Sequence, residues 1–216
     1  MSTSESSPTV VLVDDHAMVR EALAQLLEEE GIRVLGQAGE RHEAARLIAA
    51  TQPEVLLLDY SFPGGGALPL IESLRAGGNP PRILVLTVHE SLHYAVRVLE
   101  AGADGYLIKS SAVSELVDGI RAVHAGEIYV TPKLAGAVFR HLRDGRGERT
   151  GVEALSTREF ELLRLLAAGS RLKDAARVLN ISTSTASTYR TRLMEKLKVE
   201  STAELIRFAL ENDISG

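Results

Sequence analysis

The chain has 216 residues, of which 45% are hydrophobic, and a formal net charge of −5. This length suits one large domain or two small ones, each able to bury a core. The absence of cysteine excludes disulfides, thiolate metal sites and cysteine catalysis. No apolar run approaches the roughly 20 residues of a membrane span, and the first nine residues carry no Lys or Arg, unlike a signal peptide. We therefore predict a cytoplasmic protein without membrane attachment, beginning with a disordered polar tail over residues 1–8.

The charge is unevenly distributed along the chain. Residues 1–149 contain 14 Lys and Arg against 20 Asp and Glu, a net charge of −6, whereas residues 150–216 contain 10 against 9, a net charge of +1. Neither part is strongly basic, so bulk charge alone does not predict nucleic-acid binding.

Short runs rich in Val, Ile and Leu alternate with helical patterns over the first 125 residues. Such runs are typical of strands that are buried on both faces, as in a parallel sheet. The predicted strands cover residues 10–13, 32–37, 55–58, 83–86 and 106–108, and the predicted helices about 16–30, 40–51, 67–77, 90–102 and 112–125. This alternation predicts an α/β domain over residues 9–125, a flavodoxin-like, doubly wound, parallel five-stranded sheet with the strand order 2-1-3-4-5.

Four of the predicted strands are followed at once by a polar group that can handle phosphate. Asp14 and Asp15 follow the first strand, Asp59 the third, Thr87 the fourth and Lys109 the fifth. In an open α/β sheet, ligands bind outside the carboxyl ends of the strands. We therefore expect these five side chains to converge at one edge of the sheet.

The chemistry of this set indicates phosphoryl transfer. Two carboxylates about 4 Å apart repel each other by roughly 4 kcal/mol at an effective dielectric constant of about 20, and an oxygen cluster of this kind suits Mg²⁺. We predict that Asp14, Asp15 and Asp59 hold Mg²⁺ and that Asp59 is the nucleophile, because a carboxylate can carry a phosphoryl group. Lys109 supplies a positive charge and Thr87 a hydroxyl for the phosphoryl oxygens.

Taken singly, each of these residues has an ordinary structural explanation. Asp14 or Asp15 suits a helix N-cap, Asp59 a turn, Lys109 a solvated surface and Thr87 the polar end of a strand. The presence of a suitable group at all four strand ends favours a single site over four unrelated structural explanations.

Four sequence segments resemble the receiver domain of two-component response regulators. They are DDH (14–16), LLLDYSFPGG (56–65), LTVHE (86–90) and AGADGYLIKS (101–110). The resemblance implies that Asp59 accepts a phosphoryl group from a sensor histidine kinase. It also implies that Asp14, Asp15 and the Asp59 region hold Mg²⁺, that Thr87 and Lys109 bind the phosphoryl group, and that Tyr106 is the switch aromatic.

The pattern changes after Gly126. Residues 126–153 are predicted to be a linker with a helix at 133–142, followed by the polar run RDGRGERTG at 143–151. Residues 154–216 are predicted to be wholly helical. Ser156 and Glu159 form a capping-box pattern that opens a helix ending at Gly169, and further helices are expected at about 172–179, 182–198 and 202–212. Two short helices before a longer polar one indicate a helix-turn-helix domain.

The longer helix carries the candidates for DNA contact. Segment 182–199 has four basic residues against one acid, a net charge of +3, and short polar side chains in this position can reach phosphates and base edges. The candidate DNA-binding residues are Thr185, Ser187, Thr188, Tyr189, Arg190, Thr191, Arg192 and Lys196. From composition alone, a solvated helix face with a Ser/Thr-rich cap explains this segment equally well.

A second resemblance favours DNA binding. LSTREFELLRLLAAG (155–169) and RLKDAARVLNISTSTASTYRTRLMEKLKV (171–199) are similar to the LuxR-type helix-turn-helix domain, and the combination with a receiver is that of the NarL/FixJ class. The resemblance implies that Ser187, Thr188 and Thr191 face bases, with nearby basic residues on phosphates. Many relatives have Lys where this chain has Ser187. The predicted function is that of a transcriptional regulator, not an enzyme, which is activated by phosphorylation and binds promoter DNA with two half-sites as a homodimer.

Two other functions are weighed against this one. The first is a Mg²⁺-dependent phosphatase of the haloacid dehalogenase type, which usually has a second Asp two residues after the nucleophile, where this chain has Ser61. The second is a module whose helical end docks onto another protein, for which salt-insensitive binding to a protein and no retention of DNA would be the signature.

Overall fold

The computed structural model describes residues 7–62, 66–144 and 151–214. Residues 1–6 of the predicted tail and 145–150 of the predicted linker lie outside these ranges. The chain divides into two compact units, Met1–Glu90 with Val98–Ala135 and Ser91–Arg97 with Gly136–Gly216. We refer to them as the sheet unit and the helical unit.

The sheet unit is built on a parallel sheet with the strand order β2-β1-β3-β4-β5-β6. The strands are β1 (Thr9–Val13), β2 (Arg33–Ala38), β3 (Val55–Asp59), β4 (Arg82–Thr87), β5 (Gly105–Ile108) and β6 (Tyr129–Val130). The five predicted strands and their order are confirmed. The sixth strand, which pairs in parallel with β5, was not predicted, because two residues are too few to show a pattern.

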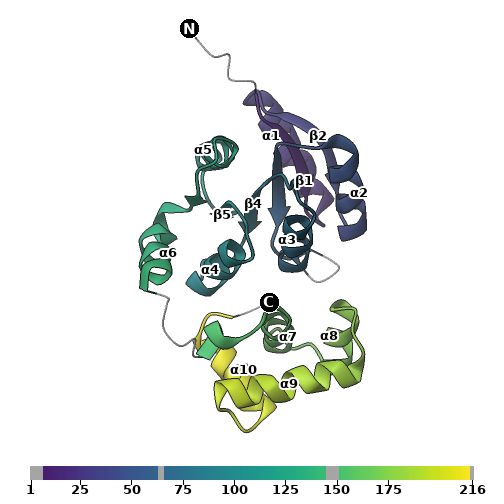
Figure 1. Ribbon diagram of the computed structural model, residues 1–216, viewed down its shortest axis with the longest axis vertical. Helices are drawn as coiled ribbons and strands as arrows, with labels where there is room; N and C mark the ends of the chain where they lie inside the picture. Colours follow the sequence, from purple (N-terminus) through teal and green to yellow (C-terminus); the bar gives the residue numbers. More distant parts are fainter. Residues whose placement is uncertain (1–6, 63–65, 145–150, 215–216) are drawn as a thin grey trace. The chain divides into compact units, whose positions relative to one another are not determined.

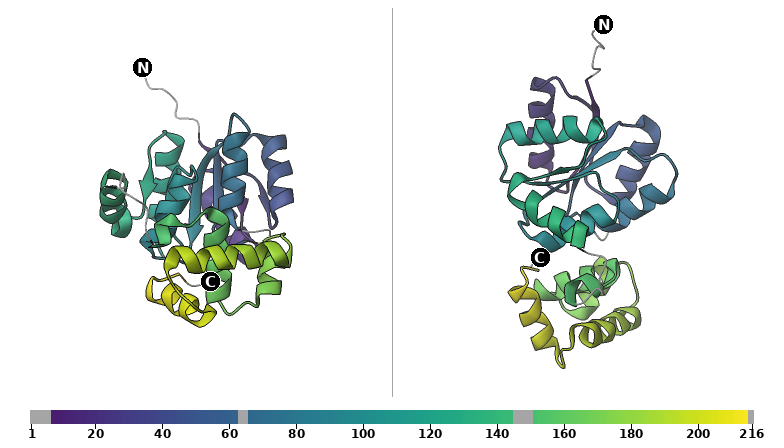
Figure 2. Two further views of the ribbon diagram at one scale, coloured as in Figure 1. Left: turned by 60° about the horizontal axis from the view of Figure 1, so that its bottom comes forward. Right: turned by 60° about the vertical axis from the view of Figure 1, so that its left-hand side comes forward.

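Helices cover both faces of this sheet (Figures 1 and 2). The helices in this part of the chain are α1 (Ala17–Glu29), α2 (Arg41–Thr51), α3 (Ala67–Ala76), α4 (Leu92–Glu100) and α5 (Val113–His124). Helices α1 and α5 share one apolar core with alternate residues of the strands, including Leu12, Leu57 and Leu107. Helices α2 and α3 lie on the opposite face. Burial of the strands on both sides explains their continuous apolar runs.

A glycine permits the close packing at the added strand. A Cβ on Gly105 would lie 2.7 Å from Leu84 Cδ1 and 2.9 Å from the Tyr129 carbonyl oxygen. Thr131, just after β6, extends the pairing, because its buried Oγ1 accepts a hydrogen bond from the backbone N–H of Ile108 at 3.1 Å. The edge of β5 is therefore closed by the segment that leads into α6 (Pro132–Asp144).

The helical unit ends the chain with a short 3₁₀ helix, η1 (Gly151–Ala154), and four α-helices. They are α7 (Thr157–Ala167), α8 (Leu172–Val178), α9 (Thr183–Leu197) and α10 (Thr202–Glu211). The predicted capping box is confirmed, since the Ser156 side chain accepts from Glu159 N and the Glu159 side chain accepts from Ser156 N. Helices α8 and α9 with their short connection confirm the predicted helix-turn-helix.

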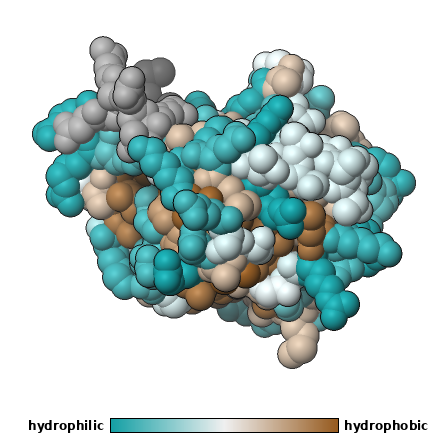
Figure 3. Space-filling view, turned by 90° about the horizontal axis from the view of Figure 1, so that it is seen from below, coloured by the Kyte–Doolittle hydropathy of each residue, from teal (hydrophilic) through white to brown (hydrophobic). Residues whose placement is uncertain are grey.

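Polar side chains dominate the face shown in Figure 3, where hydrophilic and intermediate residues surround smaller hydrophobic patches. None of the helices in the described ranges combines the length and the apolar character that crossing a membrane requires.

Candidate functional site

The carboxyl ends of β1, β3 and β5 bring Asp14, Asp59 and Lys109 together, as the sequence predicts. The Lys109 ammonium lies 2.6 Å from Asp14 Oδ2 and 2.8 Å from Asp59 Oδ1. Both carboxylates are buried, and Lys109 is one-fifth exposed at its side chain. A single cation therefore joins two carboxylates that would otherwise repel each other.

Asp15 and His16 form the outer rim of this cluster. His16 Nδ1 lies 2.9 Å from Asp15 Oδ1 and 3.3 Å from Asp14 Oδ1. The side chains of His16 and Asp15 are more exposed than that of Asp14. The alternative that Asp14 or Asp15 is the N-cap of α1 is not what the structure shows, because His16 occupies that position. Instead, Asp14 Oδ1 accepts a hydrogen bond from the backbone N–H of His16 at 2.8 Å.

Burial and charge act against each other on the two central groups. Burial raises the pKa of Asp59, which the Lys109 ammonium opposes and the neighbouring charges of Asp14 and Asp15 reinforce. Burial alone would lower the pKa of Lys109, but its hydrogen bonds to Asp14 and Asp59 outweigh that effect and raise it. Lys109 is therefore held as a cation beside Asp59.

The donor set fits Mg²⁺. Asp14, Asp15 and His16 bring ligand atoms within 4.8 Å of one another, and Lys109 links the Asp59 carboxylate to the same cluster. Carboxylate oxygens are the ligands that Mg²⁺ prefers, and it commonly takes one or two of them together with water. Asp15 is the most accessible carboxylate of the three, which suits an ion that keeps part of its hydration shell.

Thr87 and Tyr106 both form a hydrogen bond with the backbone of His89. Thr87 Oγ1 accepts a hydrogen bond from the His89 N–H at 3.0 Å, and the Tyr106 hydroxyl donates to the His89 carbonyl oxygen at 2.8 Å. Thr87 and Tyr106 are both buried. The Thr87 and Tyr106 hydroxyls are therefore connected by two hydrogen bonds to the backbone of His89.

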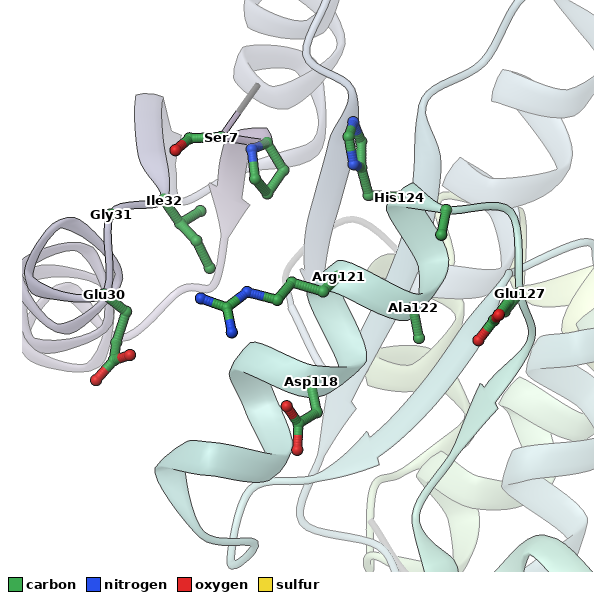
Figure 4. Close-up of a pocket in the computed structure, with 11 residues that line it drawn as sticks. Ser7, Glu30, Gly31, Ile32, Asp118, Arg121, Ala122, His124 and Glu127 are labelled. Carbon is green, nitrogen blue, oxygen red and sulfur yellow. The ribbon is translucent and has the colours of Figure 1, made fainter. Parts of the chain in front are cut away.

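A hollow in the sheet unit lies at the other end of the sheet from the phosphoryl site. A cavity of about 800 Å³ is lined by residues such as Pro8 and Ile32, which directly precede β1 and β2. Figure 4 shows Arg121 reaching from α5 into this space, with the carboxylates of Glu30 and Asp118 nearby. Its charged groups are of both signs and lie far along the strands from Asp14, so this cavity does not belong to the phosphoryl site.

Helix α9 presents most of the predicted DNA-binding residues on its surface. Thr188, Thr191 and Arg192 are exposed, and Ser187 and Arg190 are partly exposed. Among the residues that the structure describes, neither arginine side chain forms a hydrogen bond or an ion pair. Both guanidinium groups are thus available for phosphates.

The remaining predicted DNA-binding residues are Thr185, Tyr189 and Lys196. Thr185 Oγ1 lies 2.8 Å from Ser182 Oγ in the N-cap network of α9, and Tyr189 is partly exposed, as Ser187 and Arg190 are. The Lys196 ammonium lies 2.6 Å from Glu159 Oε2 and donates to the Ala154 carbonyl oxygen at 3.0 Å. Lys196 therefore ties α9 to the start of α7.

Sequence reasoning missed two contacts of the phosphoryl site. The guanidinium of Arg20 donates to the Asp14 carbonyl oxygen at 2.5 Å, and His16 completes the acidic rim. His16 stands next to the acid pair in the sequence, which was the available signal. No sequence signal indicated Arg20, because its contact with the Asp14 carbonyl oxygen depends on the direction in which α1 leaves β1.

Two families match the chain in the order of its two units. Residues 10–121 match the family described as "Response regulator receiver domain", and residues 153–209 match "Bacterial regulatory proteins, luxR family". The chain is 31% identical over 206 residues to the response regulator UvrY of Escherichia coli, covering 95% of this chain and 94% of UvrY.

Other relatives agree over the whole length. The virulence regulator BvgA of Bordetella pertussis, described as a putative positive transcription regulator, is 34% identical over 95% of this chain and 98% of its own. RcsB of Salmonella enterica serovar Typhimurium, solved on promoter P1flhDC with the phosphomimetic BeF₃⁻, superposes with a TM-score of 0.71 at 26% identity, covering 94% of this chain and 98% of RcsB.

Proposed function

We propose that this chain, which belongs to the response regulators that join a receiver domain to a luxR-family DNA-binding domain, regulates transcription when Asp59 is phosphorylated. The observation that carries the proposal is the placement of the Lys109 ammonium between Asp14 and Asp59. It unites a carboxylate nucleophile, an acidic metal site and a phosphate-binding cation at one sheet edge. We expect the protein to act in the cytoplasm, as the sequence predicts.

The phosphoryl donor is proposed to be the phosphohistidine of a sensor kinase. Lys109 engages Asp59 Oδ1, so the other oxygen, Oδ2, is left to attack the phosphorus. A P–O bond forms to Asp59 as the P–N bond of the donor breaks, and the histidine nitrogen keeps the electron pair. Asp14, Asp15 and Asp59 would hold Mg²⁺, which would supply positive charge to neutralise the phosphoryl oxygens. The protein is the acceptor in this step and turns over no substrate of its own.

The phosphoryl group is proposed to be read out through Thr87. It adds about −1.5 to −2 charges, and the Thr87 hydroxyl can donate to one of its oxygens while Lys109 neutralises another. Because Thr87 Oγ1 accepts from His89 N and Tyr106 donates to His89 O, a shift of Thr87 repositions His89 and with it Tyr106. This coupling makes Tyr106 the switch residue.

The helical unit is proposed to bind the major groove of DNA through α9. Ser187, Thr188 and Thr191 face the bases, and Arg190 and Arg192 bind phosphates. The domain has a net charge of only about +1 (10 Lys and Arg against 9 Asp and Glu over residues 150–216), so one copy makes few phosphate contacts. A homodimer on two half-sites doubles these contacts, and the RcsB structure on promoter DNA with a phosphomimetic supports the coupling of the two units.

Labelling tests the phosphoryl assignment. The full chain is incubated with acetyl phosphate and Mg²⁺, and the modified residue is located by mass spectrometry. We expect a single modification, at Asp59, that is lost in Asp59→Asn. Asp118→Asn, which changes an exposed carboxylate at the distant cavity, is the matched control and should label like the parent. Unchanged labelling of Asp59→Asn would overturn the assignment.

A further inference from the structure

The exposed side of α9 carries a narrow stripe of short polar side chains. At about 100° per residue, four positions fall within an arc of about 60°, namely Ser184, Thr188, Thr191 and Glu195. The buried residues of α9 lie on the opposite side of the helix and are Ala186, Leu193 and Leu197. The stripe is therefore the part of α9 that enters a groove if the helix binds DNA.

Two hydroxyl groups of this stripe already donate their hydrogen to backbone carbonyl oxygens of α9. Thr188 Oγ1 donates to the Ser184 carbonyl oxygen at 3.1 Å, and Thr191 Oγ1 donates to the Ser187 carbonyl oxygen at 3.1 Å. A hydroxyl has one hydrogen and two lone pairs, so each threonine keeps only acceptor capacity toward a ligand. Glu195, exposed further along the stripe, is also an acceptor when ionised. Each threonine presents a methyl group beside its oxygen.

The cations lie at the sides of the stripe and not within it. Measured from Ser184 at about 100° per residue, Arg192 is turned by about 80° in one direction and Arg190 by about 120° in the other. Arginines in these places suit the two phosphate backbones that border a groove. The position of Ser187, at the margin of the stripe, has no long cation to reach guanine O6 and N7.

From these observations, and resting on the proposed DNA-binding function, we propose that Thr188 and Thr191 select A·T base pairs in the major groove. The threonine oxygen accepts from the N6 amino group of adenine, and the γ-methyl contacts the 5-methyl group of thymine. Both kinds of pair present one amino donor and two acceptors in the major groove, but only an A·T pair adds the thymine methyl group. A threonine that faces a G·C pair can accept from the cytosine amino group, but its own methyl group then lacks the methyl partner.

Base analogues test this selection one group at a time. The phosphorylated full chain first selects its sites from randomised duplexes, and the enriched site becomes the parent probe. Replacing thymine by uracil removes only the methyl group, and replacing adenine by purine removes only the amino group. Thr188→Val keeps the methyl and removes the oxygen, while Thr188→Ser keeps the oxygen and removes the methyl, so the two variants are matched controls for each other.

We expect A·T pairs at the enriched positions and a loss of about five- to tenfold in affinity for Thr188→Val, the effect of one hydrogen bond. Thr188→Val should be insensitive to the purine replacement but still sensitive to uracil. Thr188→Ser should show the reverse. The same pattern is expected at Thr191.

Enrichment of G·C pairs, or equal responses of both variants to both analogues, would overturn this inference. Salt-dependent DNA binding that persists in that case leaves the proposed function standing. A parent chain that retains no DNA at any salt concentration would instead overturn the proposed function, and the base selection with it. Circular dichroism of the exposed-site variants confirms that α9 is intact.

Discussion

The phosphoryl site and the α9 stripe represent two opposite ways of placing polar groups. In the phosphoryl site, Asp14, Asp59 and Thr87 are at most 5% exposed and fixed by the ends of buried strands. On α9, the hydroxyls and arginines are exposed or partly exposed. Charges interact strongly where water is excluded and weakly where it is present. We therefore expect single substitutions to have large effects at the first site and smaller, additive effects at the second.

The comparison can be sharpened within the acid pair itself. Asp15→Ala removes an exposed carboxylate and should raise the Mg²⁺ concentration needed for phosphorylation by at least about tenfold. Asp14→Ala should do the same and, in addition, destabilise the sheet unit by about 1–3 kcal/mol, because it removes a buried partner of Lys109 and of His16 N.

Magnesium titrations of labelling and thermal unfolding of the full chain measure these two effects. Asp14→Asn is the control that keeps the side-chain volume and removes the charge. Equal stability of the Asp14→Ala and Asp15→Ala variants would contradict the prediction that the buried Asp14 contributes more to the stability of the sheet unit than the exposed Asp15 does.

At the exposed site, Arg190→Ala should weaken binding to all sequences alike, by several-fold. Each neutralised phosphate contributes about −0.9 to the slope of log K against log salt, so the slope should become shallower by about 0.9 per protomer. Arg207→Ala, on α10 and paired only with Glu211 among the described residues, is the control and should leave the slope unchanged. Fluorescence anisotropy at several salt concentrations measures the slope, and an unaltered slope in Arg190→Ala would remove this residue from the phosphate contacts.

The smallest expected effect concerns the contact between α7 and α9. Burial would raise the pKa of Glu159, but hydrogen bonds from Lys196 and from Ser156 outweigh it and lower the pKa. A carboxyl whose pKa is lower when folded adds stability above its unfolded value of about 4.5, and this stability is lost as the pH falls through the folded pKa.

Glu159→Gln should therefore lower the free energy of opening of α7, measured at its amides, by about 0.5 kcal/mol at pH 7. This difference should shrink as the pH falls below 4.5, the ordinary pKa of a glutamate, and disappear below the lowered pKa of folded Glu159. Hydrogen exchange followed by mass spectrometry measures it, and Glu153→Gln is the control outside the capping box. A constant difference across this pH range would show that the Glu159 charge contributes nothing.

The sequence predicted those parts of the molecule that local pattern determines. Strand ends follow apolar runs, so the meeting of Asp14, Asp59 and Lys109 at one sheet edge followed from the strand order alone. The capping box of α7 followed from Ser156 and Glu159 in the same way.

Contacts between elements were beyond sequence reasoning. Lys196 belongs by charge to the predicted DNA-binding set, yet its ammonium lies on Glu159, 37 residues away, a contact that depends on how α7 packs on α9. Strand β6 could not be predicted, because its pairing with β5 depends on the space left by Gly105 and not on an apolar sequence pattern within β6. Both belong to tertiary packing, which a single sequence does not display.

The central claim is that phosphorylation of Asp59 controls DNA binding by α9, and an affinity titration tests it most directly. The parent, Asp59→Asn and Thr87→Ala are treated with acetyl phosphate and Mg²⁺ and titrated on the selected duplex. We predict that the parent binds at least about tenfold more tightly after treatment, equivalent to about 1.4 kcal/mol, that Asp59→Asn does not respond, and that Thr87→Ala is phosphorylated but responds weakly. An equal gain in Asp59→Asn, or no gain in a parent shown to be phosphorylated, would contradict the claim.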